Sequence, residues 1–206
     1  MRTDIVGVLL AGGLSRRMGG GDKALASLAG RPMLSRLIER VGPQVAALII
    51  NANGDPARFA AFGLTVEPDE IDGFAGPLAG VLSAMAWARA HKTKATWLLS
   101  VATDVPFVPR DLVARLREAA VREDAPIACA ASNGRTHPVI ALWSLALAGD
   151  LRRALVDEGV RKVDGWTARY KVAIVEFSAE PIDPFFNVNS PDDLTEAARL
   201  IKAGVD

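Results

Sequence analysis

Short apolar runs alternate with amphipathic stretches along most of this chain. The apolar runs are nearly continuous, as expected for strands that are covered on both faces of a sheet. The amphipathic stretches repeat their apolar residues at helical spacing. We expect strands at 5–9, 45–50, 64–67, 97–102, 127–131, 139–143 and 172–177, and helices at 32–41, 56–62, 76–91, 109–122, 145–158, 160–169 and from 190 onward. This alternation predicts right-handed βαβ units and a mainly parallel sheet.

The pattern changes in the second half of the chain. Two strand-like runs, 127–131 and 139–143, follow each other with no helical stretch between them. The segment that separates them contains Asn133-Gly134, a strong turn signal. We therefore expect antiparallel pairing or a wide loop here, a departure from pure βαβ repetition.

The stretch that follows the first apolar run is rich in glycine and cations. Residues 10–23 read Leu-Ala-Gly-Gly-Leu-Ser-Arg-Arg-Met-Gly-Gly-Gly-Asp-Lys. Glycine lets backbone N–H groups come close to a phosphate, and the cations add positive charge. We interpret the stretch as a nucleotide-binding loop at the carboxyl end of a first strand, in preference to a flexible surface connection.

Two well-known phosphate-binding loops do not fit this stretch. The dinucleotide pattern Gly-x-Gly-x-x-Gly fails because Gly12 and Gly13 are adjacent and the next glycine is Gly19. The P-loop pattern needs a glycine directly before its lysine, whereas Asp22 precedes Lys23. The loop must therefore hold phosphate in another way.

Polar residues also follow the later strands. Open α/β sheets bind ligands at the carboxyl ends of their strands, where Asn51, Asp69 and Asp104 are expected. A carboxylate beside a phosphate loop suits Mg²⁺, so Asp104 is the metal candidate, against the alternative of a turn-forming aspartate. Asn51 and Asp69 have the donors and acceptors to contact a base; otherwise they are a turn asparagine and part of a solvated acidic loop.

Other polar residues carry weaker signals. Asn187 and Asn189 lie two apart in an extended segment, so their side chains can point to one side; otherwise they only lead into the last helix. Arg135 and His137 lie between the later strands, where they would contact an anionic substrate or cap a turn. Cys129 lies in an apolar run, which favours a core residue over a nucleophile.

Composition narrows the class of protein. Half of the 206 residues are hydrophobic, which supports a sizeable core. The 24 basic and 24 acidic residues cancel, which argues against a general nucleic-acid surface. One cysteine and the lack of an apolar run long enough to span a bilayer lead us to expect a soluble, cytoplasmic protein with no nucleic-acid or membrane partner.

Several separated motifs resemble the molybdenum cofactor guanylyltransferases, nucleotidyltransferases with a Rossmann-like fold. They are residues 10–23, Asn51-Ala52-Asn53, Gly76-Pro77-Leu78-Ala79-Gly80, Asp104-x-Pro106, His137-Pro138 and Asn187-Val188-Asn189 followed by Ser190-Pro191. The first motif alone marks the broad superfamily, and the combination is more specific. The resemblance implies an α/β fold: a mainly parallel, Rossmann-like three-layer sheet with an antiparallel excursion in the second half. It also implies one domain over 1–206, with nucleotide bound by about 1–110 and the acceptor by about 111–206.

The same resemblance implies an activity and its residues. GMP would pass from GTP to the terminal phosphate of molybdopterin, with or without bound molybdenum, in a Mg²⁺-dependent reaction that releases pyrophosphate; the sequence does not tell whether the acceptor already carries the metal. GTP would be bound by Leu10, Ala11, Gly12, Gly13, Lys23, Asn51, Asp69 and Asp104, with Asp104 also holding Mg²⁺. The acceptor side would use Arg17, Gly20, Asn187 and Asn189, and catalysis would depend on Arg17, Lys23 and Asp104.

Some questions stay open at the level of sequence. Cytidylyl or another nucleotidyl transfer is the nearest alternative, and a non-catalytic nucleotide-binding module is the alternative of a different class. The residues alone do not decide between guanine and cytosine. The roles of Arg16, Arg135 and His137, the oligomeric state and the protein partners in cofactor delivery also stay open.

Overall fold

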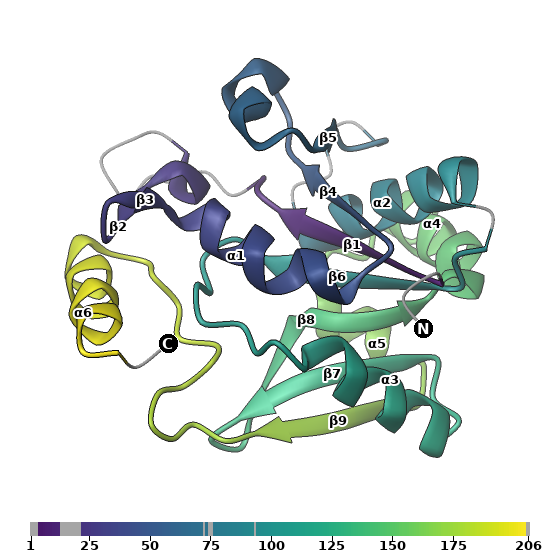
Figure 1. Cartoon of the computed structure of the whole chain (residues 1–206). Helices are drawn as coiled ribbons and strands as arrows, with labels where there is room; N and C mark the ends of the chain where they lie inside the picture. The colour runs from purple at the N-terminus through teal and green to yellow at the C-terminus, as the bar shows by residue number, and fades with distance from the viewer. Residues whose placement is uncertain (1–3, 13–21, 72, 74–75, 93, 205–206) are drawn as a thin grey trace.

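A seven-stranded sheet forms the centre of the computed structural model, which describes residues 4–12, 22–71, 73, 76–92 and 94–204 (Figure 1). The strand order is β5-β4-β1-β6-β8-β7-β9. The strands are β1 (Ile5–Leu10), β4 (Ala47–Asn51), β5 (Thr65–Glu67), β6 (Trp97–Ala102), β7 (Ile127–Ser132), β8 (Arg135–Ser144) and β9 (Val172–Phe177). A separate hairpin pairs β2 (Ser27–Leu28) with β3 (Arg31–Pro32).

The sheet is mostly parallel, as the sequence predicts. β1 pairs in parallel with β4 on one side and β6 on the other, and β4 continues to β5. β8 is the exception, because it runs antiparallel to both β6 and β7. After β1 the chain builds outward through β4 and β5 and then returns to β6, so the order reverses between β1 and β6. Ligands of open α/β sheets bind at such a reversal.

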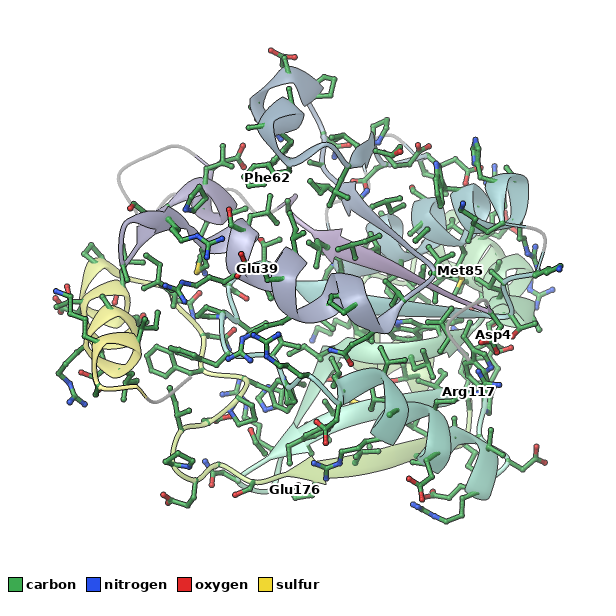
Figure 2. All side chains as sticks on the ribbon, in the orientation of Figure 1. Asp4, Glu39, Phe62, Met85, Arg117 and Glu176 are labelled. Atoms are coloured by element: carbon green, nitrogen blue, oxygen red, sulfur yellow. The ribbon has the colours of Figure 1, made fainter. Side chains whose placement is uncertain are left out.

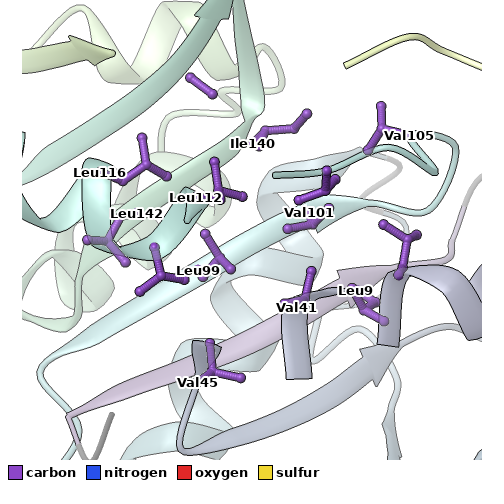
Figure 3. Close-up of a cluster of buried hydrophobic side chains, with 14 of the residues drawn as sticks. Leu9, Val41, Val45, Leu99, Val101, Val105, Leu112, Leu116, Ile140 and Leu142 are labelled. Carbon is purple, nitrogen blue, oxygen red and sulfur yellow. The ribbon is translucent and has the colours of Figure 1, made fainter. Parts of the chain in front are cut away.

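Helices cover both faces of the sheet and make three layers. One face carries α1 (Met33–Val41) and α3 (Leu112–Arg122), and the other carries α2 (Pro77–His91), α4 (Ala148–Val156) and α5 (Val163–Thr167). Figure 3 shows the first core, where Leu9 and Leu99 of the sheet meet Val41 of α1 and Leu112 of α3. The second core centres on α2, whose first three turns are almost wholly buried.

The last helix, α6 (Pro191–Lys202), lies beside β2 and β3 and away from the sheet (Figure 1). Its start is a capping box: Ser190 Oγ accepts from the N–H of Asp193, and the Asp193 carboxylate accepts from the N–H of Ser190. Its inner face packs against Leu28, Met33 and Phe107. The helix thereby fixes the segment before it at the carboxyl edge of the sheet.

Most elements lie near their predicted positions, but several differ. The hairpin of β2 and β3 was not predicted, and the helix expected at 145–158 is the 3-10 helix η4 (Leu145–Leu147) followed by α4. β8 begins at Arg135, so residues 135–138 belong to a strand and not to a loop, and only Asn133 and Gly134 form the turn. The second helix, 56–62, is the 3-10 helix η3 (Pro56–Phe62), and α5 is shorter than the expected 160–169. A bulge at Cys129/Ala130 lets β8 carry three residues that β7 does not match.

An ion pair ties helix α3 to the residue before β1. Arg117 of α3 pairs with Asp4, directly before β1, and the two side chains meet in Figure 2.

Among the described residues, no helix is both long and apolar enough to cross a membrane.

Candidate active site

Lys23 is the centre of the candidate site. It opens the 3-10 helix η1 (Lys23–Leu25), directly after the glycine-rich stretch. Its Nζ lies 2.8 Å from Asp104 Oδ2, and it also donates to Asn189 Oδ1. The side chains of Lys23 and Asp104 are 18% and 24% exposed, so this ion pair is accessible to a ligand from the solvent. Asp104 and Asn189, which are far from Lys23 and from each other in the sequence, thus meet at the Lys23 ammonium group.

Asp104 is held by its neighbours but keeps one oxygen unused. It follows β6, and its carbonyl accepts a hydrogen bond of 2.8 Å from the N–H of Val188. Its Oδ1 is buried and has no hydrogen-bond partner among the described residues. A buried carboxylate oxygen without a donor is unfavourable unless something else satisfies it. A cation held by one carboxylate together with substrate oxygens, as Mg²⁺ prefers, fits this atom.

A second cluster lies at the ends of β4 and β5. Asn51 Nδ2 donates to the carbonyl of Glu67 at 3.1 Å and to Asp69 Oδ1 at 3.0 Å. Both of its N–H donors are therefore used within the protein. Asn51 is 5% exposed, whereas Asp69 is only half-buried. In this arrangement Asp69 is the group that faces outward, and Asn51 supports it.

Gly80 gives Asn51 the room it needs. A Cβ at Gly80 would lie 2.2 Å from Asn51 Oδ1 and 2.8 Å from Leu10 Cδ2. No carbon atom can stay at such a distance from an amide oxygen, so any larger residue would push Asn51 away. The motif that contains Gly80 at the start of α2 thus serves the polar cluster by its lack of a side chain.

Of the other predicted residues in the glycine-rich stretch, the structure describes those at its start and leaves out the rest. Leu10 ends β1 and Ala11 follows it. The N–H of Ala11 donates to the carbonyl of Asn51, so this amide already has a partner within the protein. Gly12 is exposed there. Gly13, Arg16, Arg17 and Gly20 lie outside the described residues, and their roles stay predictions.

The segment before α6 brings the paired asparagines to the site. Asn187 is half-buried, and the exposed Asn189 reaches Lys23. Val188 between them is buried in the cluster that packs under α6. Upstream, Asp183 Oδ1 accepts from the N–H of Phe185 at 2.9 Å and from Ser132 Oγ at 2.8 Å. These bonds fix the path of the segment across the end of β7.

His137 belongs to the same network. Its Nε2 lies 2.8 Å from Ser132 Oγ, and its ring packs on Phe185. The hydroxyl has one hydrogen, which it donates to Asp183, so Nε2 must carry the proton in this pair. Burial lowers the pKa of His137 below its usual value, and the nearby Asp183 opposes this shift only in part. The imidazole is therefore neutral near pH 7.

Cys129 is a core residue, as predicted. Its side chain is buried, and burial raises the pKa of its thiol to about 11. Since the thiolate is the reactive form, a thiol with this pKa is a poor nucleophile. Among the described residues, no three His, Cys, Asp or Glu side chains form a metal-binding cluster.

Sequence reasoning assigned no role to two residues of this site: Asn53, which it noted only as part of a motif, and Arg58. Asn53 bonds twice to Asp69, and Arg58 pairs with Asp22 beside the catalytic candidate Lys23. The spacing of Asn53 from Asn51 is a signal, because side chains two apart along an extended chain can share a side. Arg58 gave no such signal, since its partner lies on a distant loop.

The arrangement of these elements defines a class of protein. The structure of molybdopterin-guanine dinucleotide biosynthesis protein A from Archaeoglobus fulgidus superimposes with a TM-score of 0.73, at 23% identity, over 97% of this chain and 99% of that chain. This likeness shows a common fold, a Rossmann-like α/β fold with a mostly parallel sheet.

Sequence comparison narrows the class to a family. Residues 7–172 match the family described as MobA-like NTP transferase domain. The molybdenum cofactor guanylyltransferase of Bradyrhizobium sp. strain ORS 278 is 58% identical over 198 residues, which are 96% of this chain and 93% of that protein. The enzyme of the same name from Rhodopseudomonas palustris strain BisB5 is also 58% identical, over 94% and 92%. This chain belongs to the molybdenum cofactor guanylyltransferase family and is a nucleotidyltransferase.

Proposed function

We propose that the protein transfers GMP from GTP to the terminal phosphate of molybdopterin, with release of pyrophosphate. The observation that carries this proposal is the cluster of Lys23, Asp104 and Asn189 at the reversal point of the sheet. A cation paired with a partly exposed carboxylate can exchange that partner for a phosphate. The family names of the relatives supply the acceptor, molybdopterin.

In the resting protein, Lys23 is neutralised by Asp104. We expect Lys23 Nζ to turn from Asp104 to the triphosphate when GTP binds, because both anions then compete for one cation. The loop amides after Ala11 add further donors to the same phosphates. These groups lower the cost of the charge that develops on the leaving pyrophosphate.

The reaction itself needs positioning more than a covalent nucleophile. A terminal phosphate oxygen of molybdopterin forms a bond to the α-phosphorus of GTP, and the bond from that phosphorus to the oxygen bridging the β-phosphate breaks. The electron pair leaves with pyrophosphate. The attacking phosphate monoester is mostly ionised near neutral pH, so no general base is assigned.

The carboxylate of Asp104 fits a divalent cation through its unpartnered Oδ1. Mg²⁺ bound there would supply charge neutralisation for the substrate phosphates. Asn189, which contacts Lys23, is proposed to bind the acceptor phosphate. Asn187 and Arg17 are proposed to bind the acceptor with it.

The base is proposed to bind at Asp69. The Watson–Crick edge of guanine offers two adjacent donors, an N1–H and an amino group, which suit a carboxylate. Adenine and cytosine each place an acceptor next to their amino donor, and that acceptor would face the negative charge of Asp69. The same carboxylate therefore favours guanine over both bases.

Pyrophosphate release tests this function. The purified protein is incubated with Mg²⁺, molybdopterin and one of GTP, CTP, ATP or UTP. We expect release with GTP, dependent on molybdopterin, and at least roughly tenfold less with each other nucleotide, as the loss of one charged hydrogen bond implies. Selective use of CTP would make the enzyme a cytidylyltransferase, and release without molybdopterin would contradict the proposed acceptor.

A further inference from the structure

Asn53 makes a reciprocal pair of hydrogen bonds with Asp69. Its Nδ2 donates to Asp69 Oδ2 at 2.8 Å, and its Oδ1 accepts from the N–H of Asp69 at 2.8 Å. The side-chain amide of Asn53 is thus matched to the main chain and the carboxylate of one residue. Two bonds in opposite directions fix both where Asp69 lies and how its carboxylate is turned.

The other oxygen of Asp69 is held from the opposite side. Asp69 Oδ1 accepts from Asn51 Nδ2 at 3.0 Å, so each carboxylate oxygen has one asparagine donor. An ionised carboxylate has about four acceptor positions, two on each oxygen. One position on each oxygen is therefore left for a ligand. Two such positions on one rigid carboxylate match two adjacent donors, such as an N–H and a neighbouring amino group.

Asn53 is itself anchored through its main chain. Its carbonyl accepts from Arg58 Nη2 at 2.6 Å, and Arg58 Nε lies 2.6 Å from Asp22 Oδ2. Asp22 directly precedes Lys23. A continuous chain of polar contacts therefore runs from the carboxylate of Asp69 to the residue beside the lysine.

From these contacts we infer that Asn53 is a positioning residue for base selection: it orients the Asp69 carboxylate so that the enzyme distinguishes a base with two adjacent donors from a base with one. This inference rests on the proposed function, since it presumes that the base of the nucleotide binds at Asp69. The role assigned to Asn53 is in the selection of the nucleotide base, and it is separate from any contribution of Asn53 to the stability of the loop after β4.

The matched pair of nucleotides is GTP and ITP. Hypoxanthine keeps the N1–H of guanine and lacks only the 2-amino group, so the two ligands differ by one hydrogen bond at the carboxylate. Calorimetry of the whole chain gives the two dissociation constants without an acceptor. We expect the wild-type protein to bind GTP at least roughly tenfold more tightly than ITP, as one hydrogen bond to a charged group implies.

Asn53→Ala removes the orienting amide, and Asn53→Asp keeps its size but loses the donor and adds a second negative charge. Both variants are expected to lower the GTP/ITP affinity ratio to about threefold or less. A misoriented Asp69 carboxylate loses mainly its hydrogen bond to the 2-amino group, which only GTP makes. Asp55→Ala is the matched control. Asp55 lies in the same loop and caps η3 by accepting from the N–H of Ala57, without a bond to Asp69.

The outcomes separate the inference from the proposed function. A lower ratio in either Asn53 variant, with an unchanged ratio in Asp55→Ala, supports the positioning role. An unchanged ratio in both Asn53 variants, or an equal fall in the control, overturns it, while the GTP preference of the wild-type protein still stands. A wild-type protein that binds GTP and ITP equally, or neither, refutes the proposed base site itself. Should Asn53→Ala not fold, Asn53→Asp alone decides.

Discussion

Lys23 and Asp104 are 81 positions apart in the sequence, and their side chains form an ion pair with 2.8 Å between Nζ and Oδ2. The sheet order explains this contact: Lys23 follows the loop after β1, and Asp104 follows β6, the strand that pairs with β1. The pair therefore lies at the point where the order of the parallel strands reverses. The partly exposed cation of Lys23 contacts both Asp104 and Asn189 at this edge.

Removal of the Lys23 cation should abolish most transfer activity. We expect Lys23→Met to lower kcat/KM for GTP by about 10²–10³-fold, since it deletes one donor that meets developing charge. Steady-state pyrophosphate release measures this. Lys94→Met, a substitution at an exposed lysine far along the chain, serves as control and should keep wild-type activity. Loss of less than about threefold in Lys23→Met would remove Lys23 from the proposed mechanism.

Asp104→Asn tests the proposed cation site. The amide keeps the shape of the side chain but has no net charge, so it binds Mg²⁺ poorly. We expect activity to require Mg²⁺ in the wild-type protein, to vanish with a chelator and to return when Mg²⁺ is added back. In Asp104→Asn the Mg²⁺ concentration for half-maximal activity should rise at least about tenfold. The same Mg²⁺ dependence in both proteins would exclude Asp104 as the ligand.

Gly80→Ala should damage the base site. The new Cβ would lie 2.2 Å from Asn51 Oδ1, so Asn51 must move and its bond to Asp69 is lost. We expect weaker GTP binding by roughly tenfold and a loss of stability of about 1–3 kcal/mol, the usual cost of overpacking. Calorimetry and urea unfolding measure the two effects.

Gly149→Ala is the matched control for that substitution. Gly149 lies in α4, and nothing would lie within 4 Å of its added Cβ. Gly149 is the second residue of α4 and is exposed, so we expect a change in the free energy of unfolding of at most about 0.5 kcal/mol and unchanged GTP affinity. Equal behaviour of the two glycine variants would contradict the steric account of Gly80.

His137 should titrate below its usual range. Burial lowers its pKa, and the groups that face it are Asp183, Glu176 and Arg135. A lowered pKa in the folded protein means that the neutral ring contributes stability above pH 6.5, which is lost as the pH falls through the folded pKa. The chain has only two histidines, so proton NMR resolves both titrations, and His137→Asn assigns them. A His137 signal that titrates above pH 6.5 would contradict this account.

Continuous apolar runs were the most informative part of the sequence for the fold. They predict β6 and β9 to the residue, because polar residues bound both runs: Thr96 and Thr103 enclose β6, and Lys171 and Ser178 enclose β9. The predicted start of β8, at residue 139, was wrong. Arg135, Thr136 and His137 are polar and do not show the alternation of a half-buried strand. Their strand character comes from pairing with β7, which local sequence does not reveal.

The candidate site was predictable where topology alone brings residues together. The carboxyl ends of β1, β4 and β6 meet at one edge, so Asp104 could be placed near the glycine-rich loop. The contact of Asn189 with Lys23 spans 166 positions and depends on the path of the segment before α6. Such a path is set by buried contacts like that of Val188, which the sequence does not specify in advance.

The most direct test of the proposed transfer follows the α-phosphorus of GTP. The wild-type protein is incubated with molybdopterin, Mg²⁺ and GTP labelled either at the α-phosphorus or at the γ-phosphorus, and the pterin product is isolated. We predict that the α-label appears in the pterin product, in equal amount to the pyrophosphate released, and that the γ-label appears only in pyrophosphate. Transfer of the γ-label to the pterin, or an unlabelled pterin despite bound GTP, would contradict guanylyl transfer.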